Sequence, residues 1–280
     1  MGRLDGSTAI VTGSSRGIGK GIAERFAREG ANVVVNSRSI ERARDTATDI
    51  DTGDGEVLPL AADTSEPDAV FRLVEECVQE FGRLDVMVNN AGVFSATPAT
   101  ELSVEEWNDV LATNLGGVFY GSQAAAEPMI EQGGGQIVNV SSIFGAVGVQ
   151  GRAAYNASKA GVDNLTRSLA VEWADHGIHV NALAPGFIRT EPDEANDGTE
   201  GDESPEPDRG STAGGEERTW PKYSFDDRDI ENRTPLGRFG TIEEISNCAL
   251  FLAEGNHYMT GEVLAADGGW LAFGWGSKGR

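Results

Sequence analysis

Lysine and cysteine are scarce in this sequence, and it has no long apolar run. Lysine occurs only at positions 20, 159, 222 and 278, and 45 acidic residues stand against 22 basic ones. Nucleic-acid and anionic-membrane partners need clustered positive charge, so a net charge of −23 argues against both. No run of eighteen apolar residues offers a membrane span, and the first residues lack the apolar stretch of a signal peptide. We therefore expect a cytoplasmic protein.

Two cysteines, Cys77 and Cys248, are too few for a disulfide framework. Cys77 falls on an apolar stripe over residues 70–81, which favours a small core residue over a nucleophile. The three histidines, His176, His179 and His257, form no convincing ligand set. We expect them at the surface or at helix caps, and we expect no metal.

The excess of acids predicts self-repulsion, which destabilises a compact state unless salt screens it. One hypothesis is therefore a salt-rich cytoplasm, and the alternative is an ordinary acidic protein with one acidic loop. Residues 191–217 hold eleven acids and one basic residue among many Gly, Ser and Pro. This composition predicts a mobile insertion over 191–218, serving as a substrate lid or as a solvated, salt-adapted loop. Nearby aromatics are better candidates for covering a pocket: Trp220, Tyr223 and Phe225.

Strand-like and helix-like stretches alternate along the chain. Strands are predicted at 8–12, 32–36, 56–61, 84–89, 136–140, 179–185 and 262–266. A first helix is predicted after the glycine-rich turn, with Ile18, Ile22 and Phe26 on one face, and further helices at 40–51, 66–81, 103–126, 153–174 and 241–254. Strict alternation implies parallel strands joined by helices. We therefore predict the α/β class: a Rossmann-type, doubly wound, seven-stranded parallel sheet with helices on both faces, in one domain spanning 1–280.

A glycine-rich turn follows the first strand and opens the first helix. Its glycines are Gly13, Gly17 and Gly19, and Ser15, Arg16 and Ile18 lie between them. Glycine permits positive φ and lets backbone N–H groups approach a pyrophosphate, which the helix N-terminus then favours. In this position the turn predicts a dinucleotide site.

The end of the second strand bears on the choice of cofactor. Sites for NAD usually place an acid about twenty residues beyond the glycines, and here Ser37 and Arg38 occupy that region. Arginine pairs with a 2′-phosphate that a carboxylate would repel, and Arg16 could contact the same group. NADP is therefore favoured over NAD, although both arginines could equally be surface residues.

Polar and small residues also end the third and fourth strands. Asp63, followed by Thr64, could cap the next helix or hold the adenine. Asn90, Ala91 and Gly92 suit close packing against a cofactor, although a plain turn uses the same residue types.

The predicted helix 103–126 contains a local conflict. It begins with Ser103 and Glu106 in a capping-box pattern, yet Asn114 and two glycines interrupt it. Each Gly costs up to about 1 kcal/mol relative to Ala in a helix, so we predict a functional kink at this point.

Tyr155 and Lys159 are four residues apart in a segment of helical pattern, so their side chains share a face. A free phenol titrates near pH 10, and a neighbouring ammonium lowers that pKa. Ser141 and Ser142 follow the run 136–140 and are expected at the carboxyl edge of the sheet, where ligands bind. A serine hydroxyl there could hold a substrate oxygen while Tyr155 exchanges its proton. The same spacing also occurs in surface pairs, so the rest of the chain must decide.

From about residue 6 to 270 the sequence resembles the compact, single-domain branch of the short-chain dehydrogenase/reductase family. The resemblance is carried, in family order and spacing, by TGSSRGIG at 12–19, NNAG at 89–92, Asn114, Ser142, the Tyr155–Lys159 pair and PGFIRT at 185–190. It implies Tyr155 as the acid/base and Lys159 as its pKa partner and ribose ligand. It also implies that Ser142 orients the substrate and that Asn114 supports a water-mediated proton relay. Pro185, Gly186, Ile188 and Thr190 would border the nicotinamide.

The resemblance further implies an enzyme that moves hydride between a nicotinamide cofactor and a small carbonyl or secondary-alcohol substrate. The usual tetramer of the family agrees with a tail rich in aromatics (Trp270, Phe273 and Trp275), which we expect at a subunit contact. EWADHGIHVNALAPG and DGGWLA are similar to members that act on sugars and sugar acids, whereas TGSSRGIG and TPLGRFG are equally typical of 3-oxoacyl thioester reductases. A non-catalytic, cofactor-sensing protein on the same fold is a third reading.

Overall fold

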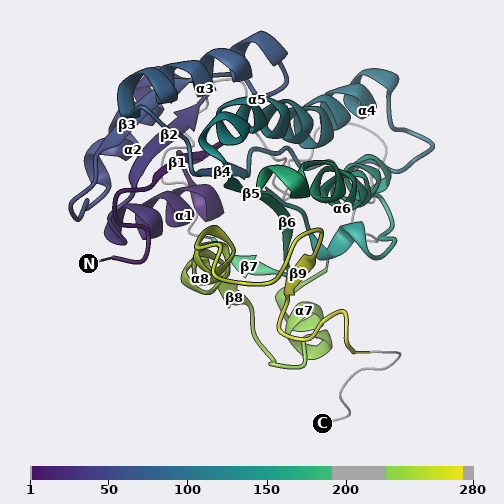
Figure 1. Ribbon diagram of the computed structural model, residues 1–280. Helices are drawn as coiled ribbons and strands as arrows, with labels where there is room; N and C mark the ends of the chain where they lie inside the picture. Colours follow the sequence, from purple (N-terminus) through teal and green to yellow (C-terminus); the bar gives the residue numbers. More distant parts are fainter. Residues whose placement is uncertain (1, 191–224, 274–280) are drawn as a thin grey trace.

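The computed structural model describes residues 2–190 and 225–273, and its centre is a parallel sheet of seven strands (Figure 1). The strand order is β3-β2-β1-β4-β5-β6-β9. The strands are β1 (Thr8–Val11), β2 (Asn32–Ser37), β3 (Val57–Ala61), β4 (Val86–Asn89), β5 (Gly135–Val140), β6 (Ile178–Pro185) and β9 (Val263–Ala266). Strands β1, β2, β4, β5 and β6 are mostly buried runs of Val, Ile and Ala, as expected where helices cover both faces.

Helices pack on both faces of this sheet. They are α1 (Gly17–Arg28), α2 (Ile40–Asp49), α3 (Pro67–Phe81), α4 (Val104–Leu111), α5 (Gly117–Gln132), α6 (Ala153–Trp173), α7 (Asp227–Arg233) and α8 (Ile242–Ala253). One core joins the sheet to α1, α2 and α8, and a second joins it to α3, α5 and α6. Figure 1 shows α1 and α8 on the opposite side of the sheet from α3 and α5. The predicted fold is thereby confirmed.

Short elements complete the described chain. Two 3₁₀ turns, Ile143–Gly145 and Ala174–His176, flank α6. A separate two-stranded sheet pairs β7 (Ile188–Arg189) with β8 (Gly240–Thr241). Among the described residues, none of the helices is both apolar enough and long enough to span a bilayer.

The expected kink in the helix over 103–126 is present as a π-helical turn. Residues Ala112–Gly116, with Asn114 at their centre, separate α4 from α5. The Ser103 hydroxyl accepts the 3.0 Å hydrogen bond from Glu106 N that the capping pattern predicts. The Glu106 carboxylate, however, accepts hydrogen bonds from Ser95 and Thr97, so it stabilises the loop after β4.

The expectations about individual side chains have different outcomes. Trp270 is not at a subunit contact, because it is buried within the chain beside Phe144 and Phe187. The expectation for His179 and His257 is confirmed: both are partly exposed, with rings 5.7 Å apart, and His257 Nε2 lies 3.2 Å from Leu252 O in the last turn of α8. Cys77 is fully buried, and burial raises the pKa of its thiol to about 12, which confirms a core role. The acidic segment 191–218, Trp220, Tyr223 and Trp275 lie outside the described residues.

Candidate functional site

The glycine turn lies where the strand order reverses, between β1 and β4, which is the point at which doubly wound sheets bind ligands. Gly13 has a φ of +61°, and a Cβ there would lie 2.8 Å from Ala91 Cα. A Cβ at Gly19 would lie 2.5 Å from the backbone oxygen of Gly13. Both positions therefore require glycine, and the backbone at the start of α1 stays open to a bound anion.

Thr12 and Asn90 hold this turn in place. The Thr12 hydroxyl accepts hydrogen bonds from the backbone N–H groups of Asn90 (2.9 Å) and Ala91 (3.0 Å). The Asn90 amide donates to the carbonyl oxygens of Thr12 (2.8 Å) and Gly13 (3.1 Å). Asn90 therefore braces the glycine turn as well as lining the cavity beside it.

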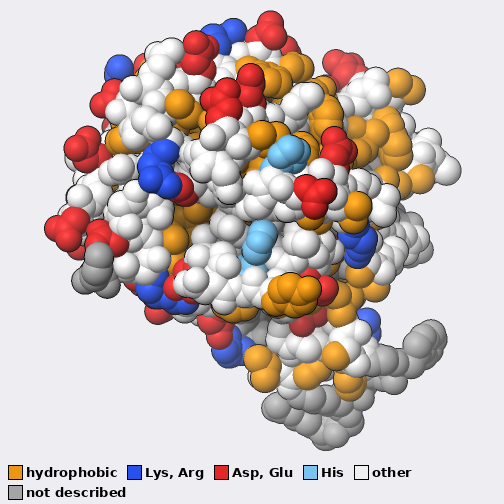
Figure 2. Space-filling view, in the orientation of Figure 1, with side chains coloured by type: hydrophobic (Ala, Val, Ile, Leu, Met, Phe, Trp, Pro, Cys, Tyr) orange, Lys and Arg blue, Asp and Glu red, His pale blue; other side chains and the backbone are white. Residues whose placement is uncertain are grey.

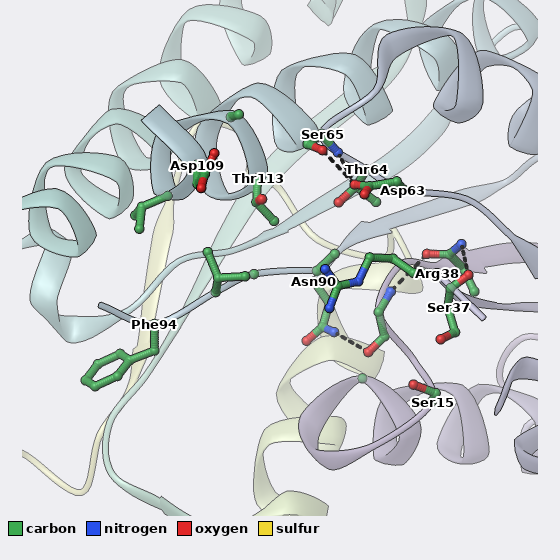
Figure 3. A pocket seen from close by; sticks show the side chains of 18 of the residues that line it. Ser15, Ser37, Arg38, Asp63, Thr64, Ser65, Asn90, Phe94, Asp109 and Thr113 are labelled. Atoms are coloured by element: carbon green, nitrogen blue, oxygen red, sulfur yellow. Dashed lines mark hydrogen bonds between the residues drawn. The ribbon is translucent and has the colours of Figure 1, made fainter. Parts of the chain in front are cut away.

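A cavity of about 1330 Å³ extends from this turn across the carboxyl edge of the sheet (Figure 3). In Figure 3, Ser37, Arg38 and Asn90 lie toward one end, and Phe94 lies at the other. The predicted cofactor residues that line the cavity are Gly13, Ser15, Arg16, Gly17, Ile18, Gly19, Ser37, Arg38, Asp63, Thr64, Asn90, Ala91, Gly92 and Thr190. The volume exceeds the roughly 300–1,000 Å³ of typical small-molecule sites, which suits an extended dinucleotide.

Other predicted cofactor residues do not line this cavity. Pro185 and Gly186 end β6, where Gly186 N donates a 3.0 Å hydrogen bond to Ala266 O. Ile188 packs against the core on the α1 side. Asp63 does not cap α3, because its Oδ1 accepts hydrogen bonds from the backbone and hydroxyl of Ser65 instead. Glu66 holds the N-cap position and makes no side-chain cap.

Tyr155 lies in the first turn of α6, between two aromatic rings. Its ring centroid is 5.0 Å from that of Phe94 and 6.3 Å from that of Phe144. Burial raises the pKa of the phenol, while a hydrogen bond with Ser142 and the charge of Arg152 act against that rise. The net direction is opposite to the one expected from the Tyr-Lys spacing, because the loss of solvation outweighs the nearby positive charge.

Lys159 is almost completely buried beneath Tyr155. Its Nζ lies 5.6 Å from the centre of the Tyr155 ring and donates a 2.8 Å hydrogen bond to Val140 O. Burial lowers the pKa of Lys159 to about 8, and the nearby Asp163 carboxylate opposes this change. Ser141 donates hydrogen bonds to Asp163 Oδ1 and to Lys159 O, so its hydroxyl is committed to packing β5 against α6. Of the two serines, Ser142 is therefore the one that interacts with Tyr155.

The Asn114 side chain is buried and fully engaged. Its Oδ1 accepts a 2.7 Å hydrogen bond from Val93 N, and its Nδ2 donates to Val93 O (2.9 Å) and to Ser158 Oγ (3.1 Å). Ser158 in turn donates to Tyr155 O. The amide thus ties the loop after β4 to α6, and it brings Phe94 and Tyr155 together. A proton relay through Asn114 stays a prediction.

The family model described as short chain dehydrogenase matches residues 7–200, and a second, described as Enoyl-(Acyl carrier protein) reductase, matches 218–271. The chain belongs to the short-chain dehydrogenase/reductase family. Members of this family are NAD(P)-dependent oxidoreductases, so the resemblance drawn from the motifs is confirmed.

Relatives in this family carry two kinds of name. The 3-oxoacyl-(acyl-carrier-protein) reductase of Thermotoga maritima is 38% identical over 95% of this chain and 98% of its own. The gluconate 5-dehydrogenase of Gluconobacter oxydans is 35% identical over 95% of each chain. A 2-dehydro-3-deoxy-D-gluconate 5-dehydrogenase from Dickeya dadantii is 35% identical over 96% of this chain and 97% of its own.

A solved family structure shows the same fold. A short-chain type dehydrogenase/reductase from Mycobacterium marinum superposes with a TM-score of 0.80 at 35% identity, covering 95% of this chain and 96% of the other.

Five residues that bear on this family site were not identified from the sequence: Thr12, Asn36, Phe94, Arg152 and Asp163. Asn36 is a polar residue that ends a run of valines, and its Oδ1 accepts a 3.2 Å hydrogen bond from Gly13 N. A polar residue at the end of an apolar strand could have indicated that Asn36 belongs to the site. Asp163 lies one turn beyond Lys159 and Arg152 lies three residues before Tyr155. Spacing alone does not distinguish either from a surface charge.

Proposed function

We propose that this chain interconverts a carbonyl and a secondary alcohol on a sugar, sugar acid or related polyol, with Tyr155 as acid/base and NADP as the preferred cofactor. The observation that carries the proposal is the Tyr155 phenol, which is coupled to the Ser142 hydroxyl where β5 ends. Tyr155 also contacts Phe94, which lines the large cavity.

The glycine turn and the cavity fit a nicotinamide dinucleotide, because Gly13 and Gly19 keep the start of α1 open to a pyrophosphate. When bound, such a cofactor supplies or accepts the hydride. Tyr155 gives its proton to the substrate oxygen in reduction and takes it back in oxidation. Ser142 orients that oxygen, and the Lys159 ammonium favours the phenolate. A phenol with its ordinary pKa near 10 is protonated at neutral pH, and burial shifts the pKa of Tyr155 further in the same direction, which supports carbonyl reduction there.

The preference for NADP rests on the end of β2. Ser37 stands where an acid would accept from a ribose 2′-OH, and Arg38 extends across the cavity toward Asn90 (Figure 3). Arginine can pair with a 2′-phosphate through two parallel hydrogen bonds.

An acyl thioester reductase is the second candidate, because relatives of that name are as similar as the sugar-acid dehydrogenases. A substrate delivered by an acidic carrier protein would need a basic docking patch. Figure 2 shows Lys and Arg side chains scattered among more numerous Asp and Glu side chains on the face in view. This surface favours the sugar-type substrate.

Self-association and a cytoplasmic setting are also part of the proposal. The outer faces of α5 and α6 border a shallow depression lined by Leu111, Leu115, Phe119, Tyr120 and Leu165, and Phe119 is 38% exposed. This apolar surface supports a homo-oligomer, with a tetramer as the expected state. Both cysteines are free thiols, which is typical of a reducing compartment.

The test is Tyr155→Phe. This variant should lose turnover of every carbonyl substrate while it binds NADPH with unchanged affinity, because only the exchanged proton is removed. Measured NADPH oxidation at the wild-type rate would refute the assignment. Turnover by neither protein on a broad panel of ketones, despite NADPH binding, would favour a non-catalytic cofactor-sensing protein.

A further inference from the structure

Arg152 holds a cation beside the candidate proton donor. It is the N-cap of α6, three residues before Tyr155, and its side chain is partly buried. The guanidinium carbon lies 4.3 Å from the centre of the Phe94 ring, which contacts Tyr155 edge to face. The charge of Arg152 acts on the pKa of Tyr155. Of these residues Phe94 lines the cavity, and both Arg152 and Tyr155 contact its ring.

This cation has no acidic partner in residues 2–190 and 225–273, although the sequence holds twice as many acids as bases. Arg189 and Arg238, by contrast, do have acidic partners, Asp227 and Glu244. The guanidinium of Arg152 loses solvation without gaining an ion pair, and this burial lowers its pKa. A partly desolvated charge normally has a counter-charge.

The start of α6 adds positive potential around Arg152. The first turn of α6 contains no acid, and its N-cap makes no side-chain hydrogen bond. A helix N-terminus carries a partial positive charge, which adds to that of Arg152. The aromatic rings of Phe94 and Phe144 offer an apolar wall on either side of Tyr155.

We propose that Arg152 binds a carboxylate carried by the substrate, so that the enzyme acts on oxo acids and hydroxy acids of the sugar type. This inference rests on the proposed function and narrows its substrate class. The planar guanidinium matches a carboxylate with two parallel hydrogen bonds. A neutral ketose or an acyl thioester would leave the Arg152 charge unpaired. A site discriminates strongly against a substrate that leaves a buried polar group without a partner.

The experiment compares two matched ketones with the NADPH-loaded enzyme. One is 5-keto-D-gluconate, and the other is L-sorbose, in which a hydroxymethyl group replaces the carboxylate. The readout is the ratio of kcat/KM for the acid to kcat/KM for the neutral ketone. Because a change in Tyr155 acidity affects both substrates, it cancels in this ratio.

The wild type should prefer the acid, and Arg152→Gln should reduce that preference by about 10- to 100-fold, the typical effect of a charged hydrogen bond. Arg152→Lys keeps the positive charge but cannot form two parallel hydrogen bonds, so its ratio should lie between those of the wild type and Arg152→Gln. Arg189→Gln removes another ring-stacked guanidinium, 4.6 Å from Phe239, and should leave the ratio unchanged. An unchanged ratio in Arg152→Gln, or no preference in the wild type, would overturn the inference.

A binding measurement separates this inference from the proposed function. Calorimetric titration of the NADPH-loaded protein with D-gluconate and with D-glucitol involves no turnover, because cofactor and ligand are both reduced, and only the gluconate affinity should depend on Arg152. Turnover of ketones without a carboxylate preference defeats the inference and leaves the proposed function standing. Arg152-dependent gluconate binding without turnover of any ketone supports the inference and defeats the proposed function. Absence of both effects defeats the inference.

Discussion

The Lys159 ammonium donates a 2.8 Å hydrogen bond to the carbonyl oxygen of Val140, the residue that ends β5. This bond fixes the amine at the edge of the sheet, directly before Ser141 and Ser142. It also partly replaces the water that burial removes from the charge. The acid/base machinery is therefore positioned by β5 and α6 together.

Replacing Asp163 should change the pH dependence of reduction. The carboxylate raises the pKa of Lys159 against burial, which holds it at about 8. We expect kcat/KM for carbonyl reduction to decline above pH 8 as Lys159 loses its proton, and to decline at lower pH in Asp163→Asn. The measurement is kcat/KM between pH 6 and 10. Asp175→Asn removes an exposed acid and should keep the wild-type profile. Superimposable profiles for Asp163→Asn and the wild type would show that Asp163 only supports packing.

Gly13→Ala should weaken cofactor binding by about tenfold or more, because the new Cβ would lie 2.8 Å from Ala91 Cα and displace the turn. Gly6 is a matched control: it also has a positive φ, +72°, but a Cβ there meets nothing within 4 Å. Gly6→Ala should therefore cost about 1 kcal/mol of stability from backbone strain alone, with unchanged affinity. Fluorescence titration with NADPH gives the affinity, and equal effects of both variants would contradict the close approach.

The sheet, every helix except α7 and about half of the cavity-lining residues could be predicted from the sequence, because alternating apolar runs and glycine turns are local signals. The kink at Asn114 was predictable for the same reason, since glycine opposes helix locally. The raised pKa of Tyr155 was not, because it depends on how completely Phe94 and Phe144 exclude water. These residues come from other segments of the chain.

Trp270 illustrates a second limit. An aromatic residue near the carboxyl terminus predicts an exposed contact when only its neighbours in sequence are considered. In the structure Phe144 and Phe187 bury it, and Arg233 lies 4.1 Å above its ring centre. Burial of this kind depends on tertiary contacts that no local pattern encodes.

Arg38→Asp should shift cofactor preference from NADP toward NAD by about tenfold or more, because a carboxylate repels the 2′-phosphate and accepts from the 2′-OH. The measurement is the ratio of kcat/KM for NADPH to that for NADH. Arg42→Asp makes the same charge change at an exposed position of α2 that does not line the cavity. If both variants shift the ratio equally, the effect is one of overall charge and Arg38 is a bystander.

His179 should make the fold less stable under mildly acidic conditions. Burial, and then the neighbouring His257, lower the pKa of His179 below its usual value near 6.5. The unfolded chain therefore binds a proton more readily than the folded chain does. The contribution of His179 to the free energy of unfolding is complete above about pH 6.5 and is lost as the pH falls through the lowered pKa. Urea midpoints at pH 5, 6 and 7 should show a smaller loss for His179→Gln than for the wild type. His176→Gln changes an exposed histidine and should behave like the wild type. If the urea midpoint of His179→Gln falls with pH as much as that of the wild type, His179 is not the cause of the acid sensitivity.

Salt should stabilise this protein by screening its own negative charge. The net charge is −23, and acidic side chains outnumber basic ones on the face in Figure 2, so repulsion acts over distances that dilute buffer leaves unscreened. The Debye length falls from about 10 Å at 0.1 M to about 3 Å at 1 M salt, and KCl between 0.05 and 2 M should therefore raise Tm. Sucrose of equal osmolality controls for excluded-solute effects and should raise Tm less. A Tm that is independent of KCl would mean that the acidic surface carries no net repulsive cost, and that salt adaptation is not its origin.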